Sequence, residues 1–209
     1  TSVAQTWGPA AQPWPVQRLR LDPALQPGES RELHFRTTLA ERGFPNSAPL
    51  TRIVANGSFL DNSQITPMLG IDPGGFLKDR AKRRKHGLPP DLRPPKLEDD
   101  RARARSMFRA DSDWVRADIT VTTDADQTPI APGQAVSEQV ADGRRTVRFV
   151  PRAPINHFFS IQSARYAVER DRLGDIELAV YHHPAHPYNV QRMLKAMKAS
   201  LALFSEIFS

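Results

Sequence analysis

Residues 115–123 alternate strictly between apolar and polar side chains, and this pattern constrains the fold more than any other feature of the chain. A side-chain period of two is typical of a β-strand that has one face on a core and the other in water. The apolar face comprises Val115, Ala117, Ile119 and Val121. The pattern therefore predicts a strand from Val115 to Thr123.

Shorter alternating runs recur along the chain, at residues 19–21, 33–37, 51–55, 146–150, 158–169 and 176–180. Turn or break signals separate them, at residues 26–29, 56–57, 129–133, 142–143 and 173–175. Nineteen prolines also favour turns and edge strands over long helices. We therefore expect a mainly β fold, an antiparallel β-sandwich.

Two segments carry a helical pattern. Residues 95–110 are highly charged, and Asp99 and Arg103 are spaced for an i,i+4 pair. Residues 190–208 predict a long amphipathic helix with Asn189 as its N-cap. Its apolar face comprises Val190, Met193, Met197, Leu201, Phe204 and Phe208, widened by Leu194 and Ile207. Because that face needs a partner, we expect the polypeptide to continue beyond Ser209.

The basic residues behind the net charge of +6 gather in two blocks, of which the first comprises Lys78, Arg80, Lys82, Arg83, Arg84 and Lys85. The second comprises Arg101, Arg103, Arg105 and Arg109 and is preceded by three acidic residues, so we base the site prediction on the first block. These side chains are the candidate residues for contact with an anion or a membrane surface, and a solvated loop is the alternative interpretation. Aromatic residues do not interleave with the block, so base stacking has no support. A nucleic-acid-binding function would rest on charge alone.

No residue set in the chain predicts catalysis. His182, His183 and His186 are the candidate metal ligands, but Pro184 and Pro187 prevent the helical spacing of a zinc motif, and a histidine-rich turn is the alternative. The chain has no cysteine, no G-x-S-x-G motif and no phosphate-binding loop ending in Gly-Lys-Ser/Thr. We therefore expect neither catalytic residues nor a cofactor within these 209 residues.

From Leu25 onward, several short blocks occur in an order and spacing that resemble a known family. The blocks are residues 25–30, 43–44, 56–60, 67–70, 84–88, 113–115, 126–127, 131–133, 154–155, 158–160, 163–166 and 181–184, with His186 and Asn189. Together they resemble the N-terminal part of the aminopeptidase N family of zinc metallopeptidases, the gluzincins. The bacterial branch joined to ABC-type permease helices is the most similar.

The resemblance implies a domain organisation. Residues 1–15 would be a linker or disordered arm, and residues 16–181 a saddle-like N-terminal β-sandwich domain with a basic excursion at 76–110. Residues 182–209 would be a turn and the first helix of a truncated catalytic domain. The family's H-E-x-x-H and G-x-M-E-N motifs do not occur here. The basic excursion takes roughly the place of its F-P-C-F-D-E-P segment.

The function implied by the resemblance is that of a non-catalytic N-terminal domain fragment that shapes the substrate entrance of a zinc-dependent aminopeptidase. Zinc and the peptide substrate would bind the full-length parent. The expected partners are the rest of the catalytic domain, the parent's membrane helices and an anionic lipid surface. The location would be the extracytoplasmic, periplasmic face of a membrane. The alternative is an extracytoplasmic interaction domain of an ABC-type permease complex without peptidase activity.

Overall fold

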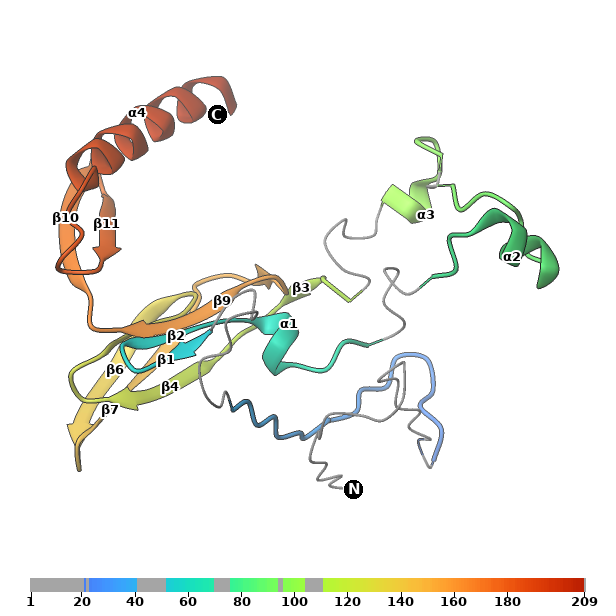
Figure 1. Ribbon diagram of the computed structural model, residues 1–209, viewed down its shortest axis with the longest axis horizontal. Coiled ribbons are helices and arrows are strands. Elements are labelled where there is room, and N and C mark those ends of the chain that lie inside the picture. Colours follow the sequence, from blue (N-terminus) through green and yellow to red (C-terminus); the bar gives the residue numbers. More distant parts are fainter. Residues whose placement is uncertain are drawn as a thin grey trace. The chain divides into compact units, whose positions relative to one another are not determined.

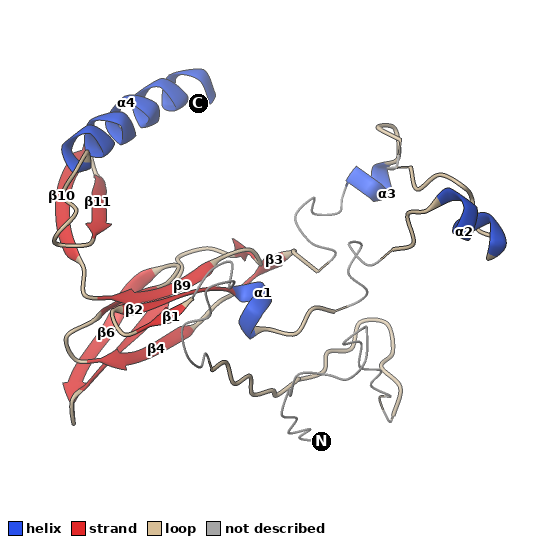
Figure 2. Cartoon of the chain, in the orientation of Figure 1, coloured by secondary structure: helices blue, strands red, loops and turns tan. Residues whose placement is uncertain are grey.

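The structure is a computed structural model that describes residues 21, 23–40, 52–69, 76–93, 96–103 and 111–208. Strands predominate over helices, and the sheets are antiparallel (Figure 2). The expected mainly β fold class is therefore confirmed. The predicted arm at 1–15 and most of the predicted strand at 19–21 lie outside the described residues, and Leu21 itself is not in a strand.

The chain divides into two compact units, which comprise residues 1–49, 60–117 and 153–160, and residues 50–59, 118–152 and 161–209. The first contains α1 (Asn62–Ile65), α2 (Arg80–Lys85), α3 (Asp100–Arg103), β3 (Trp114–Val115) and β8 (Ile155–Asn156). The second contains β1 (Ile53–Val54), β4 (Ile119–Asp124), β5 (Thr128–Ile130), β6 (Gln134–Ala141), β7 (Arg144–Val150), β10 (Ala167–Leu173), β11 (Ile176–His182) and α4 (Val190–Phe208). Most of β2 (Gly57–Asp61) and β9 (Ser160–Ala164) also belongs to the second unit.

The three-stranded sheet β4-β7-β6 carries much of the core of the second unit (Figure 1). Val147 and Phe149 of β7 are buried, and they pair across the ladder with Val121 and Ile119 of β4. The other face of the sheet is polar, and Asp118 there accepts hydrogen bonds from Arg148 Nε and Nη2 at 2.9 and 2.6 Å. The predicted alternation of the 119–123 region is thus confirmed.

A two-residue turn joins β6 to β7. Asp142 and Gly143 have φ of 50° and 73°, the left-handed values that such a hairpin requires. The sequence predicts this turn but not β6 itself. The ladder shifts register between Ala135 and Ser137, so Val136 is a bulge residue that breaks the alternation. Every side chain of β6 is exposed, which leaves no apolar face to detect.

A second sheet has the order β1-β2-β9-β5. β1 and β2 form a hairpin, with Val54 opposite Gly57, so Ala55 and Asn56 make the turn, one residue before the predicted Asn56-Gly57. The positive φ expected at Asn56-Gly57 is wrong, because Gly57 is the first residue of β2. Gly57 is needed for a reason that the sequence does not show. A Cβ at this position would lie 1.9 Å from the carbonyl oxygen of Ser163 on β9. Absence of a side chain at Gly57 therefore allows two strands to approach each other.

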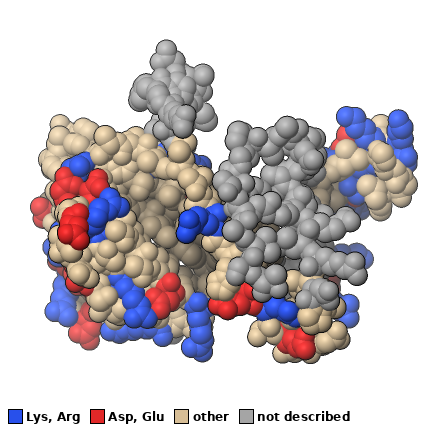
Figure 3. Space-filling model, turned by 90° about the horizontal axis from the view of Figure 1, so that it is seen from below, with Lys and Arg blue, Asp and Glu red and all other residues tan. Residues whose placement is uncertain are grey.

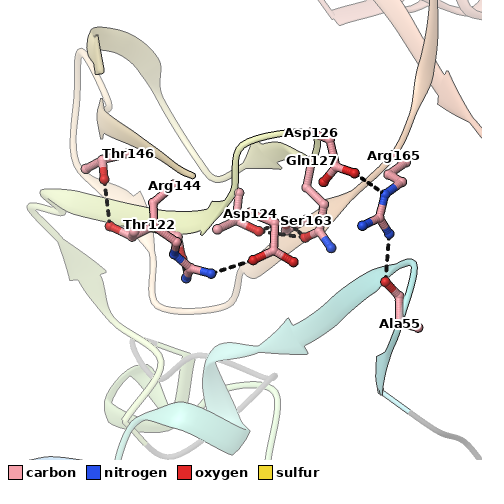
Figure 4. A network of polar contacts seen from close by, with 10 residues as sticks. Ala55, Thr122, Asp124, Asp126, Gln127, Arg144, Thr146, Ser163 and Arg165 are labelled. Carbon is pink, nitrogen blue, oxygen red and sulfur yellow. Dashed lines mark hydrogen bonds and ion pairs between the residues drawn. The ribbon is translucent and has the colours of Figure 1, made fainter. Parts of the chain in front are cut away.

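Polar contacts join the two sheets into an open sandwich-like arrangement (Figure 4). The hydroxyls of Thr123 on β4 and Ser163 on β9 each lie 2.6 Å from Gln127 Oε1, and all three residues are buried. Nearby, Arg165 donates to Asp126 at 2.5 Å and to the carbonyl oxygen of Ala55 at 2.7 Å. Because buried polar groups are costly without partners, this network fixes how the sheets meet.

Two predicted strands and one predicted strand break have the wrong bounds. The strand predicted at 115–123 is two strands, since β3 pairs with β8 and β4 pairs with β7. The run predicted at 158–169 is likewise divided between β9 and β10, which belong to different sheets. Pro129 does not end a strand but lies within β5, at the edge of its sheet, where a proline's missing N–H is tolerated.

In the first unit, the strand predicted at residues 33–37 does not form. Residues 31–40 have no regular secondary structure, and Leu33, Phe35 and Leu39 are exposed. The turn predicted at 26–29 is present, because Glu29 N–H donates to the carbonyl oxygen of Gln26 at 3.0 Å.

The helix predicted at 95–110 is described only in part, and α3 begins at Asp100. The expected Asp99–Arg103 pair is wrong. Asp99 instead accepts hydrogen bonds from the N–H groups of Arg101 and Ala102, and Arg103 pairs with Asp100 at 3.3 Å.

Candidate functional site

The hairpin β10–β11 holds the first half of α4 (Figure 1). β10 and β11 pair along their whole length, from Ala167 opposite His182 to Leu173 opposite Ile176. The turn between them contains Gly174, whose φ is 57°. Leu178 of β11 and Val190 and Leu194 of α4 are buried, each with 4% exposure or less. The predicted helix is confirmed, and its N-terminal half packs on the strands that precede it.

An ion pair also anchors α4 to the hairpin. Lys198 Nζ lies 2.5 Å from Asp171 Oδ2 on β10. Hydrogen bonds from Lys198, and then from the backbone N–H of Arg172, lower the pKa of Asp171. The carboxylate therefore stays ionised at neutral pH and holds the middle of the helix.

The second half of α4 presents large apolar side chains to solvent. We call this set the open face; it comprises Leu203 (52% exposed), Phe204 (54%), Ile207 (58%) and Phe208 (79%). The sequence predicts a single apolar face, but the hairpin covers only part of it. At about 100° per residue, the exposed members lie on one side of the helix, away from Lys195 and Glu206.

The open face has the chemistry of a docking surface. It offers aromatic and aliphatic groups without an ionisable side chain, and contiguous exposed apolar patches of this kind mark interaction sites on proteins. The rings of Phe204 and Phe208 lie 6.0 Å apart, so they form one continuous aromatic surface. Such a surface can bind but cannot catalyse.

The six candidate basic residues separate into two groups. Arg83 is buried and donates from Nε to the carbonyl oxygen of Pro89 at 2.6 Å and from Nη1 to that of Leu77 at 2.8 Å. Arg80 pairs with Asp91 at 3.0 Å. Lys78, Lys82, Arg84 and Lys85 are exposed. The interpretation as a solvated loop is wrong at its centre, because α2 occupies residues 80–85.

The candidate histidines lie where β11 leads into α4: His182 is the last residue of β11, and His183 and His186 lie in the turn that follows. The rings of His183 and His186 lie 4.9 Å apart. Nδ1 of His183 accepts a hydrogen bond from the Ala185 N–H at 3.1 Å, and Nδ1 of His182 lies 2.9 Å from the carbonyl oxygen of His183. Backbone groups thus occupy one nitrogen on each of two rings. Among the described residues, no group of three or more His, Cys, Asp or Glu side chains could hold a metal ion.

Several carboxylates of the second unit form ion pairs on its surface. Arg148, Arg144 and Arg170 pair with Asp118, Asp124 and Glu177, respectively. Arg148 lowers the pKa of Asp118 through its hydrogen bonds. These pairs join neighbouring strands, so they act as cross-strand contacts rather than as acid–base groups.

The comparisons with known proteins add no relative. No protein-family model matches the chain, and neither the curated proteins nor the solved structures contain a significant match. Within the residues that the structure describes, we find no helix with the length and apolar character of a membrane span.

Sequence reasoning missed three features of these sites. The first is the Asp171–Lys198 ion pair, which joins residues 27 positions apart. The second is the structural role of Arg83, which is indistinguishable in sequence from its basic neighbours. The third is the division of the apolar face of α4. A helical wheel could have found only the last, since Leu203 and Ile207 lie beside the apolar stripe that contains Val190 and Leu194 rather than on it.

Proposed function

We propose that this chain is the non-catalytic β-rich N-terminal domain, with the first helix of the catalytic domain, of an aminopeptidase-like zinc metallopeptidase, and that the open face of α4 packs against the rest of that catalytic domain. In this role it shapes the entrance through which peptides reach the zinc. The resemblance of residues 25–189 to the N-terminal part of that family motivates the proposal, and the mainly β fold is compatible with it.

One observation carries the docking role. The first half of α4 is fixed by Val190, Leu194 and Lys198, whereas the second half exposes the open face. An anchored helix loses little conformational freedom when it binds, so it is a suitable docking element. Covering the half-exposed Leu203, Phe204 and Ile207 would contribute on the order of 1 kcal/mol each.

The first experiment tests whether the chain itself binds zinc or has peptidase activity. We expect the purified 209-residue protein to bind no stoichiometric zinc and to hydrolyse no aminoacyl-anilide. Zinc content measured by mass spectrometry and a chromogenic peptidase assay check this. Bound zinc together with activity would contradict the proposal.

The second experiment tests docking in the parent protein. Phe204→Ser with Ile207→Ser should lower the melting temperature of the catalytic domain and its activity on long peptides. Lys195→Ser with Glu206→Ser, on the opposite side of α4, is the matched control and should change neither. Equal effects of the two double variants would exclude docking through the open face.

The coding sequence after Ser209 separates the proposal from its alternative. An intact H-E-x-x-H motif within about 150 residues is expected of a peptidase, because both histidines must ligate the zinc from one helical face. Permease helices without that motif would instead favour an interaction domain of an ABC-type complex.

A further inference from the structure

Residues 76–93, which we call the basic segment, carry most of the excess charge of the protein. The segment has seven Lys and Arg residues and two Asp residues, whereas the net charge of the whole chain is +6. Figure 3 shows blue side chains gathered on the small lobe at the right edge, where Figure 1 places α2. Elsewhere on that view, blue and red side chains are mixed.

Both aspartates of the basic segment are already engaged. Asp79 caps α2, since its side chain accepts a hydrogen bond from the Lys82 N–H at 2.7 Å. Asp91 pairs with Arg80 at 3.0 Å and with Arg93 at 3.7 Å. The segment therefore has no further carboxylate of its own to neutralise the exposed cations.

Six cations of the basic segment are exposed, and Arg80 and Arg93 among them pair with Asp91. The other four are Lys78, Lys82, Arg84 and Lys85. Arg83 points inward, where two carbonyl oxygens bind it. At about 100° per residue, Lys85 lies roughly opposite Arg83, and Lys82 and Arg84 lie on either side. The three outer side chains of α2 thus surround its solvent-facing surface.

Hydrogen bonds at both ends hold α2 in place, although the helix is short. The N–H of Gly87 donates to the carbonyl oxygen of Arg84 at 3.0 Å, and that of Leu88 donates to Arg83 at 2.9 Å. With φ of 68° at Gly87, this is a Schellman C-cap. The helix is capped at both ends and clamped by Arg83, so its cations are held together on one element.

Exposed apolar side chains accompany the cations. Phe76, Leu88 and Leu92 are 40–47% exposed, and they flank α2 on both sides in sequence. Leucine side chains cannot stack on bases as a nucleic-acid groove requires, but they can enter the boundary between headgroups and acyl chains. Cations and apolar groups in one segment therefore favour a lipid surface over a nucleic acid.

We propose that the basic segment is a peripheral site for anionic phospholipid surfaces, in which Lys78, Lys82, Arg84 and Lys85 contact headgroups and Leu88 and Leu92 enter the interface. The site is independent of the docking role of α4 and can be tested separately. Each basic residue near an anionic bilayer strengthens binding about fivefold, and this attraction weakens as salt is raised.

The test is sedimentation of the 209-residue protein with phosphatidylcholine vesicles, with and without phosphatidylserine. We expect binding only to the anionic vesicles. Lys82→Gln, Arg84→Gln and Lys85→Gln together should weaken it about a hundredfold. The matched control is Arg116→Gln, Arg152→Gln and Arg172→Gln, which removes three exposed charges elsewhere and should weaken binding less than tenfold.

Additional measurements identify the ligand. Leu92→Ser should reduce vesicle binding severalfold while leaving retention on a soluble polyanion, inorganic polyphosphate, unchanged. Circular dichroism of each variant checks that the fold is kept. Equal losses in the two triple variants, or tighter binding to duplex DNA than to anionic vesicles, would overturn the lipid site. Absence of vesicle binding at low salt would overturn it as well.

Discussion

Residues 33–37 and strand β4 carry the same alternation of apolar and polar side chains, yet only β4 is a strand. Ile119 and Val121 of β4 pair with Phe149 and Val147 of β7 and face the core. Leu33 and Phe35 remain exposed in a segment without regular structure. Alternation is therefore not sufficient for a strand, and a neighbouring strand edge decides whether one forms.

The contrast follows from the energy of a strand. An extended backbone leaves its N–H and C=O groups in water until a second strand pairs with them, and side-chain burial supplies most of the stabilisation. β4 has a pairing partner, because it forms a ladder with β7, and its apolar side chains face the core. Residues 33–37 have one long-range hydrogen bond among those described, from Thr37 Oγ1 to the carbonyl oxygen of Ile65 at 2.9 Å.

The largest expected effect tests this contrast directly. Phe149→Ala should lower the free energy of unfolding of the second unit by about 3 kcal/mol, because it leaves a cavity in the core. Phe35→Ala should change it by no more than about 0.5 kcal/mol. Urea unfolding followed by circular dichroism measures both. Similar losses for the two variants would mean that residues 33–37 pack as a strand does.

A slightly smaller effect is expected where two strands approach closely. Gly57→Ala should cost about 2 kcal/mol, because the added Cβ would collide with the backbone of β9. Gly143→Ala, where a Cβ would meet no atom within 4 Å, should cost about 1 kcal/mol through its positive φ alone. Thermal unfolding compares the two, and a smaller cost at Gly57 would show that β2 and β9 can separate.

The polar network between the sheets should give an intermediate effect. Thr123→Val removes a buried hydroxyl that bonds to Gln127 and Ser163 and should cost about 1.5 kcal/mol. Thr122→Val is the control on the next residue, because the Thr122–Thr146 contact is exposed, and it should cost less than about 0.5 kcal/mol. If urea unfolding gave equal costs, the network would not contribute to joining the sheets.

The smallest effect concerns pH at the ion pair that holds the middle of α4. The pKa of Asp171 is lowered in the folded protein, so its stabilisation is fully present above the carboxyl's ordinary pKa and is lost as the pH falls through the lowered value. Amide-exchange protection of residues 190–201 should therefore fall below about pH 4, relative to that of β7. Asp171→Asn should abolish this relative change, and an unchanged acid response in that variant would contradict the assignment.

Prediction from the sequence was most successful where the signal was local. The turns at residues 26–29 and at Asp142-Gly143 and the helix from Val190 depend on backbone preferences and on the period of nearby side chains. It failed where a bulge or a change of sheet interrupted the period, as at Val136 and at residues 116–118. The sequence does not divide the candidate basic residues into structural and exposed ones, because that division depends on the carbonyl oxygens that bind Arg83.

The amino-acid sequence alone determined that the protein is mainly β, where several of its turns lie, and that an amphipathic helix follows the last strand. These properties depend on φ preferences and side-chain periods within a few residues. Only the tertiary structure shows which alternating segments become strands, why position 57 requires a glycine and which part of α4 stays uncovered. Those outcomes depend on contacts between residues distant in sequence, and no local pattern encodes the partner that a given edge or face will find.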